Sequence, residues 1–196
     1  RRPRRAPALP KVENPGMFPA WVWLRPADGY DAPRKRGEDA FAAFAALGFR
    51  LQIIPAGSTG DATRCEIHRP WTFIFGSLPF EDVSVFTDSL ADLHCSVIMD
   101  CHFPIMDMEN AIGADEAIIN IIDNKDVLLA NLAAADVVTV PHPAWAEQLA
   151  AVNPNVFLLP DVDDTPDAFM LRLGEVAQAS IQVKQARQAA RREMGL

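Results

Sequence analysis

Residues 135–160 read ADVVTVPHPAWAEQLAAVNPNVFLLP, and this pattern sets the expected architecture. The apolar runs 136–140 and 155–159 each end at a proline and predict two buried strands. Between them, residues 143–152 have helical spacing and begin with a proline, which is favoured in the first turn of a helix. A strand, a helix and a strand in this order predict a parallel βαβ unit.

The same alternation extends towards the N-terminus. Further short apolar segments predict four more strands, at residues 18–24, 49–54, 71–75 and 95–99. Helical spacing is found at residues 38–47, 80–93, 115–122 and 125–134. Short apolar strands that alternate with helices are typical of parallel sheets covered on both faces. We therefore predict an α/β fold, with a Rossmann-like parallel sheet of about six strands and helices on both faces.

The chain divides into three predicted parts. Residues 1–16 are rich in proline and arginine and predict an extended basic arm. Residues 17–165 predict the Rossmann-like domain. Residues 166–196 predict one long C-terminal helix that becomes polar after Lys184.

Composition excludes several classes of protein. With 49% hydrophobic and 22% charged residues among 196, the chain is not disordered as a whole. A net charge of −8 argues against specific nucleic-acid binding. No apolar run is long enough to span a bilayer, and no apolar segment follows the basic start, so we expect neither a membrane span nor a signal peptide. Three cysteines without framework spacing favour a reducing, cytoplasmic location.

Candidate binding residues follow the predicted strands. In an open parallel sheet, ligands bind beside the carboxyl ends of the strands. This rule selects as candidate substrate-binding residues Arg25, Asp28, Gly29, His142, Asp161 and Asp164. The alternative is that polar residues stand there only because the chain turns.

The densest reactive cluster is Asp100-Cys101-His102, directly after the strand predicted at 95–99. An imidazole beside a carboxylate can act as a general base, because the carboxylate stabilises the protonated form. Asp100 and His102 are therefore the candidate catalytic residues. A role in capping or fixing the loop is the alternative for each.

Other patterns bear on metal and phosphate chemistry. The candidate metal groups are Cys65 with His68, Asp107 and Glu109 together with Asp100 and His102, and Asp161 with Asp163 and Asp164. The first lacks the second half of a zinc site, the second would suit magnesium, and the third would suit a metal-dependent hydrolase or transferase. Asp164 or Thr165 can instead cap the final helix. No phosphate-loop or nucleophile-elbow pattern occurs. Because each metal candidate is incomplete or has a simpler interpretation, we predict no metal and no cofactor.

Residues 131–164 resemble the end of the N-terminal domain of GT-B glycosyltransferases. In that family, a strand with the pattern A-D-x-V-x-x-x-S/T precedes a helix, a strand and a P-N-x-x-D hinge. Asp136 matches the first pattern. Pro160 and Asp164 match the ends of the hinge, and Asp161 replaces its asparagine.

The resemblance implies an acceptor-side domain that helps to transfer a sugar from a nucleotide sugar to an acceptor. Asp100 or His102 would stand near the point of transfer, and Asp28-Gly29-Tyr30 faintly matches the family's glycine-rich turn. The family's donor-binding domain is not among these residues. The alternative is a non-catalytic assembly module that docks a partner, or a second copy, through the N-terminal arm and the C-terminal helix.

Overall fold

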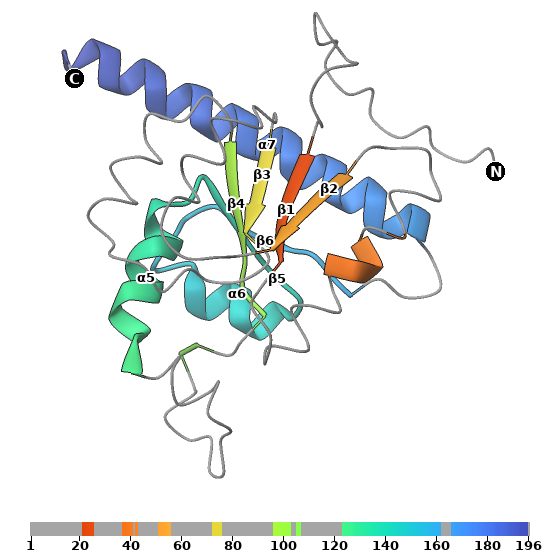
Figure 1. The fold of residues 1–196 in the computed structure, drawn as a ribbon. Helices are drawn as coiled ribbons and strands as arrows, with labels where there is room; N and C mark the ends of the chain where they lie inside the picture. Colours follow the sequence, from red (N-terminus) through yellow and green to blue (C-terminus); the bar gives the residue numbers. More distant parts are fainter. Residues whose placement is uncertain are drawn as a thin grey trace, which may run out of the picture.

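A parallel β-sheet with helices packed against it forms the fold (Figure 1). The structure is a computed structural model, and it describes residues 21–25, 37–40, 42, 51–55, 72–75, 96–102, 105–106, 123–161 and 166–195. The strands are β1 (Trp21–Arg25), β2 (Leu51–Pro55), β3 (Thr72–Phe75), β4 (Ser96–Asp100), β5 (Val137–Val140) and β6 (Val156–Leu158). The helices are α5 (Lys125–Ala134), α6 (Pro143–Leu149) and α7 (Pro166–Glu193).

The strands pair in the order β2-β1-β3-β4-β5-β6, and each pairing between neighbours is parallel. Their carboxyl ends therefore lie along one edge of the sheet. In the pairing registers, Leu24 lies opposite Phe75, Phe75 opposite Met99, and Asp100 opposite Thr139. The order of connection reverses between β1 and β3, which is where open parallel sheets form a ligand crevice.

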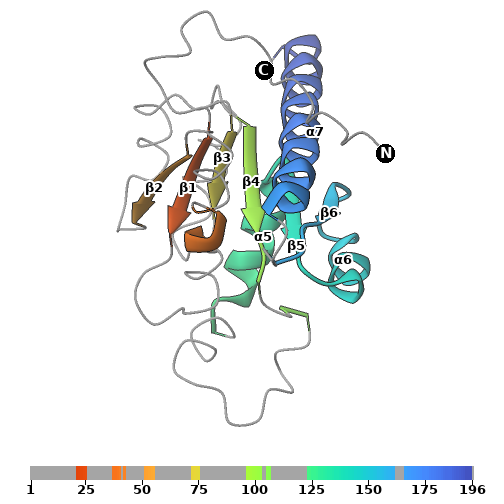
Figure 2. The same ribbon diagram turned by 90° about the vertical axis from the view of Figure 1, so that its right-hand side faces the viewer.

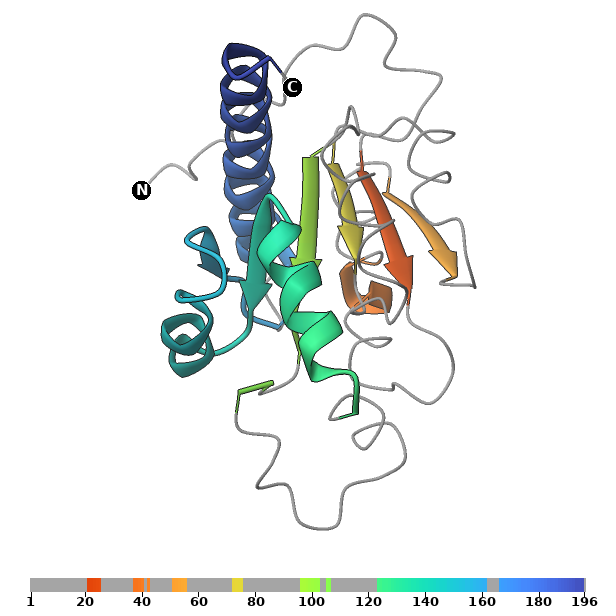
Figure 3. The same ribbon diagram turned by 90° about the vertical axis from the view of Figure 1, so that its left-hand side faces the viewer.

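Helices α5 and α7 lie on opposite faces of the sheet, as the two side views show (Figures 2 and 3). Helix α7 runs against β3, β4 and β5, whereas α6 packs beside β5 and β6. All five residues of β4 are buried, because this strand has neighbours on both sides and helices on both faces. Alternation along β4 turns Ile98 towards α7 and Met99 towards the face that carries α5.

The core between α7 and the sheet is apolar. Residues of α7 are buried at spacings of three and four, so that one stripe of the helix faces the sheet. The members of this core are Ala40, Ile74, Ile98, Val137, Leu159, Phe169, Met170, Leu173, Val176 and Ala177. Burying a side chain such as Leu173 contributes about 1.5–3 kcal/mol. This core fixes α7 across the middle of the sheet.

The α/β class, the parallel sheet and the long C-terminal helix agree with the prediction from sequence. Asp100, expected to follow its strand, belongs to β4, because it pairs with Thr139 of β5. Arg25 likewise closes β1, where it pairs with Pro55. The arm predicted at 1–16 and the helices predicted at 80–93 and 115–122 lie outside the described residues.

Candidate functional site

Three side chains predicted from sequence come together at the carboxyl edge of the sheet. Nε2 of His102 lies 3.8 Å from Oδ2 of Asp100 and 3.5 Å from Oδ1 of Asp161. Asp100 ends β4, His102 follows it by two residues, and Asp161 follows β6. The imidazole therefore joins two strand ends that are distant in the chain.

Exposure increases across this cluster. The side chain of Asp100 is fully buried, that of His102 is 9% exposed, and that of Asp161 is 59% exposed. His102 thus lies between a carboxylate in the interior and a carboxylate at the surface. Because Coulomb interactions strengthen away from water, the buried carboxylate acts on the imidazole more strongly at equal distance.

Asp100 has its orientation set from the neighbouring strand. The hydroxyl of Thr139 donates a hydrogen bond of 2.6 Å to Oδ1 of Asp100. Thr139 lies opposite Asp100 in the β4–β5 pairing, and both side chains are buried. The two oxygens of the carboxylate therefore have different neighbours. Oδ1 accepts the hydrogen bond from Thr139, and Oδ2 faces His102.

The chemistry open to this cluster is proton transfer. An imidazole flanked by two carboxylates is stabilised when it becomes protonated, so it can accept a proton from a ligand hydroxyl. The geometry around His102 therefore favours an acid–base site. Within the described ranges, no group of three or more His, Cys, Asp or Glu side chains is arranged to hold a metal ion. The other metal candidates, at positions 65, 68, 107, 109, 163 and 164, lie outside the described residues.

The remaining predicted site residues have different positions. Arg25 ends β1 at the same edge, two strands from Asp100 in the sheet order. Neighbouring strands are about 4.8 Å apart, so the two backbones are roughly 10 Å apart. His142 precedes α6, is exposed, and packs edge-on against Trp145, with ring centroids 4.7 Å apart. Three further candidates, Asp28, Gly29 and Asp164, lie outside the described residues.

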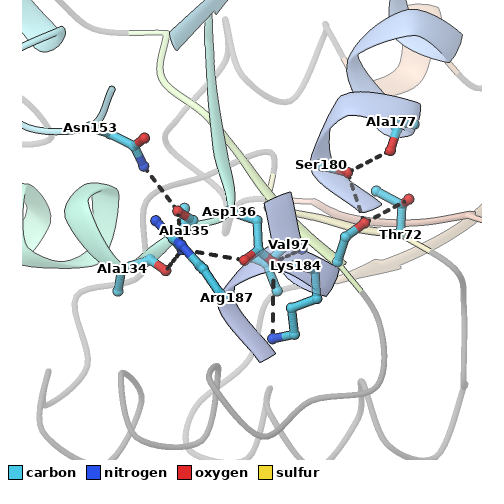
Figure 4. Close-up of polar contacts among 11 residues, drawn as sticks. Thr72, Val97, Ala134, Ala135, Asp136, Asn153, Ala177, Ser180, Lys184 and Arg187 are labelled. Atoms are coloured by element: carbon cyan, nitrogen blue, oxygen red, sulfur yellow. Dashed lines mark hydrogen bonds and ion pairs between the residues drawn. The ribbon is translucent and has the colours of Figure 1, made fainter. Parts of the chain in front are cut away.

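A second polar cluster lies at the opposite, amino edge of the sheet (Figure 4). Asp136, directly before β5, lies 3.3 Å from Nη1 of Arg187 and 4.0 Å from Nζ of Lys184, and both cations belong to α7. Its Oδ2 also accepts a hydrogen bond of 2.9 Å from the backbone N–H of Val97. Burial raises the pKa of Asp136, while Lys184, the Val97 amide and Arg187 oppose that rise.

Asp136 is the residue that carried the first family pattern, and its contacts have a structural explanation. It joins the start of β5 to α7 and to β4. Asn153, in the same stretch, is fully buried, and its Nδ2 donates to the backbone oxygens of Leu132 and Ala135. Both residues hold the connections around β5 together. The presence of Asp136 in the family pattern is therefore explained by the fold and does not by itself indicate catalysis.

Sequence reasoning did not select Thr139, Lys184 or Arg187. The signal for Thr139 was a hydroxyl inside an otherwise apolar strand, opposite an acidic residue of the next strand. Lys184 and Arg187 belong to a stretch whose composition predicts a solvated polar end of the helix. Lys184 is nevertheless 5% exposed, because the helix carries it back over the sheet to Asp136. Only the three-dimensional packing brings these residues together.

Helices in the described ranges include none whose length and hydropathy would suit a membrane crossing.

Comparison with known proteins adds a weak structural likeness. No protein-family model matches the chain, and the search of curated proteins found no match. Among solved structures, the chain is similar to the LacI family transcriptional regulator CCPA from Weissella paramesenteroides, which was crystallised with bound glucose. The two share 10% identity with a TM-score of 0.36, over 84% of this chain and 91% of the regulator. A likeness at this level assigns no family to the chain.

Proposed function

We propose that this chain is the acceptor-side domain of a glycosyltransferase-like protein, which helps to transfer a sugar from a nucleotide sugar to an acceptor hydroxyl. The observation that supports the proposal is the position of His102 between Asp100 and Asp161, at the edge of the sheet where ligands bind. The resemblance of residues 131–164 to GT-B enzymes supplies the reaction class. A donor-binding domain would have to be supplied from outside these residues.

In the proposed reaction, His102 takes the proton of the acceptor hydroxyl. The acceptor oxygen then forms a bond to the anomeric carbon of the sugar, and the bond from that carbon to the diphosphate oxygen breaks. The electron pair of the broken bond leaves with the nucleoside diphosphate. A cation beside the leaving group favours this step, and Arg25, at the same sheet edge, is the residue we propose for it.

The other predicted residues take binding roles in this proposal. Asp161 is 59% exposed, so a ligand hydroxyl that approaches from solvent can donate to it. Asp28, Gly29, His142 and Asp164 would contact the acceptor or the sugar. The nucleotide sugar is a co-substrate, no further cofactor is needed, and the protein would act in the cytoplasm.

The test uses the full chain and a panel of UDP-glucose, GDP-mannose and free monosaccharides, followed by two-dimensional NMR. The proposal expects the amide signals of residues 100–102 and 161 to move in response to at least one of these probes. His102→Ala and Asp161→Asn should weaken that response. Glu147→Gln, an exposed change on α6, is the control and should leave it intact. An intact spectrum that no probe perturbs at millimolar concentration would refute the proposal.

A second candidate function is a non-catalytic assembly module that binds another copy of the chain. One observation favours it: α7 runs beyond its last contacts with the sheet, and Met194, just past the helix, is 66% exposed. Light scattering of the full chain and of the Met194→Ser variant tests it. If the chain is an assembly module, the full chain should form a dimer or a larger assembly, and Met194→Ser should weaken it. A monomer at all concentrations would exclude this mode of assembly.

A further inference from the structure

We infer that Thr139 is a positioning residue, which holds the carboxylate of Asp100 beyond hydrogen-bond distance from His102 and reduces its negative potential there. The inference rests on the proposed role of His102 as the base. The evidence is the 2.6 Å hydrogen bond from the Thr139 hydroxyl to Oδ1 of Asp100, beside the 3.8 Å separation between Oδ2 and Nε2 of His102.

Asp100 is bonded to Thr139 and only faces His102. A separation of 3.8 Å is too long for a hydrogen bond, whereas 2.6 Å is the usual length of one between a hydroxyl and a carboxylate. Asp100 is therefore held more firmly by β5 than by the imidazole. Thr139 and Asp100 face each other across two paired strands, so the backbone register fixes their approach.

The hydrogen bond from Thr139 also changes the electrostatic potential at His102. A hydroxyl that donates to a carboxylate withdraws part of its negative charge, so the potential at a nearby imidazole becomes less negative. Asp100 comes from β4 and Asp161 from the segment after β6, and both carboxylates face Nε2 of His102. Each carboxylate stabilises the imidazolium. Thr139 weakens this interaction on the buried side.

Removing the Thr139 hydroxyl should therefore shift the His102 titration in one direction. In Thr139→Val the carboxylate of Asp100 loses a donor, and its potential at His102 becomes more negative. This change stabilises the imidazolium. The midpoint of the His102 titration should rise by about 0.5 pH or more. In Thr139→Ser, which keeps the hydroxyl, it should stay where it is.

The chain offers a matched control at the opposite edge of the same sheet. Thr72 is also fully buried in a strand, and its hydroxyl also lies in a hydrogen bond, at 3.0 Å from Oγ of Ser96. Thr72→Val makes the same chemical change under the same burial but far along the strands from His102. It should lower stability to a similar degree without moving the His102 titration.

The experiment follows the imidazole signals of the ligand-free full chain by NMR between about pH 4 and 9, with His102 assigned by its loss in His102→Gln. An upward shift in Thr139→Val, with Thr139→Ser and Thr72→Val unchanged, supports the inference. No shift, a downward shift, or an equal shift in Thr72→Val overturns it. Thr139→Ala repeats the test with a smaller side chain if the valine variant does not fold. Since no ligand is present, failure of nucleotide-sugar binding would refute the proposed function without affecting this result.

Discussion

Nη1 of Arg187, in the last third of α7, lies 3.3 Å from Oδ1 of Asp136, which immediately precedes β5. The same nitrogen donates to the backbone oxygens of Ala134 and Ala135, at 3.0 and 2.8 Å. One guanidinium therefore holds the end of α5, the turn after it and the start of β5 (Figure 4). Carbonyl oxygens at a helix C-terminus lack partners within the helix, and this cation donates to two of them, one of which also accepts from Asn153.

Arg187→Ala should lower the free energy of unfolding by about 1–2 kcal/mol, the low end of the range for hydrogen bonds to charged groups, because the side chain is partly exposed. Arg192→Ala, at an exposed position near the end of the same helix, is the control and should change stability by less than about 0.5 kcal/mol. Urea unfolding followed by circular dichroism measures both. Equal effects of the two substitutions would contradict the anchoring role.

Asp136 should make stability depend on pH. Burial raises its pKa in the folded chain above the ordinary value of 3.8, so over the interval between those two values the folded chain binds more protons at this site than the unfolded chain. The contribution of Asp136 to the free energy of unfolding therefore falls as pH rises through that interval. Above the raised pKa, this contribution no longer changes with pH.

Unfolding of the parent chain and of Asp136→Asn from about pH 3.5 to neutrality checks this sign. The unfolding free energy of the parent chain, relative to that of Asp136→Asn, should fall as pH rises through the acidic range and become constant towards neutrality. Two curves that stay parallel throughout would show that Asp136 does not titrate differently in the folded state.

Asn153→Ala should destabilise the chain by about 1–3 kcal/mol, because the backbone oxygen of Leu132 loses this donor inside the protein, while that of Ala135 keeps Arg187. The side chain donates to Leu132 and Ala135 at 2.8 and 2.9 Å, and its Oδ1 accepts from the backbone N–H of Asn155. Asn155→Ala keeps that N–H and is the matched control. Thermal unfolding should show a clear loss for the first variant and little change for the second.

The hydroxyls of Thr72, Ser96 and Ser180 form a buried chain between the sheet and α7. Ser180 donates to the backbone oxygen of Ala177 at 2.7 Å, so its single proton is used there and Ser96 must donate to Ser180 across 2.8 Å. Thr72 then donates to Ser96 at 3.0 Å. The order of donors runs from β3 through β4 into the helix.

Ser96→Ala should therefore cost more stability than Thr72→Val, since Ser96 stands in the middle of the chain and Thr72 at its end. We expect about 1–3 kcal/mol for the first and about 1 kcal/mol for the second. Chemical denaturation of both variants decides the order. A larger loss for Thr72→Val would contradict the central role of Ser96 in this chain of hydroxyls.

Much of the fold could be predicted from sequence because short apolar segments such as 136–140 leave few alternatives to a buried parallel strand. The pairing of Asp100 with Thr139 could not, because strand order is set by packing between distant segments. The same limit applies to Lys184. Its charge indicates solvent, but the register of α7 on the sheet places it against Asp136.

For the candidate site, the rule that ligands bind beside carboxyl ends selected Asp100, His102 and Asp161, and the structure brings these three together. The rule predicts only at which edge of the sheet a ligand binds, and it predicts no distances between side chains. It therefore selected His142 equally, which instead lies exposed against Trp145. Local sequence cannot distinguish the two histidines, because each follows the end of a buried strand by two residues. The course of the chain after each strand decides which imidazole meets Asp161.

The position of α7 in the chain has a consequence for synthesis. Phe169, Leu173 and Val176 cover apolar side chains of strands that are made much earlier, among them Ile74 and Ile98. On the ribosome, that face of the sheet has emerged before its cover exists. The nascent polypeptide therefore exposes this apolar surface until α7 has left the exit tunnel, and surfaces of this kind are prone to aggregation during synthesis.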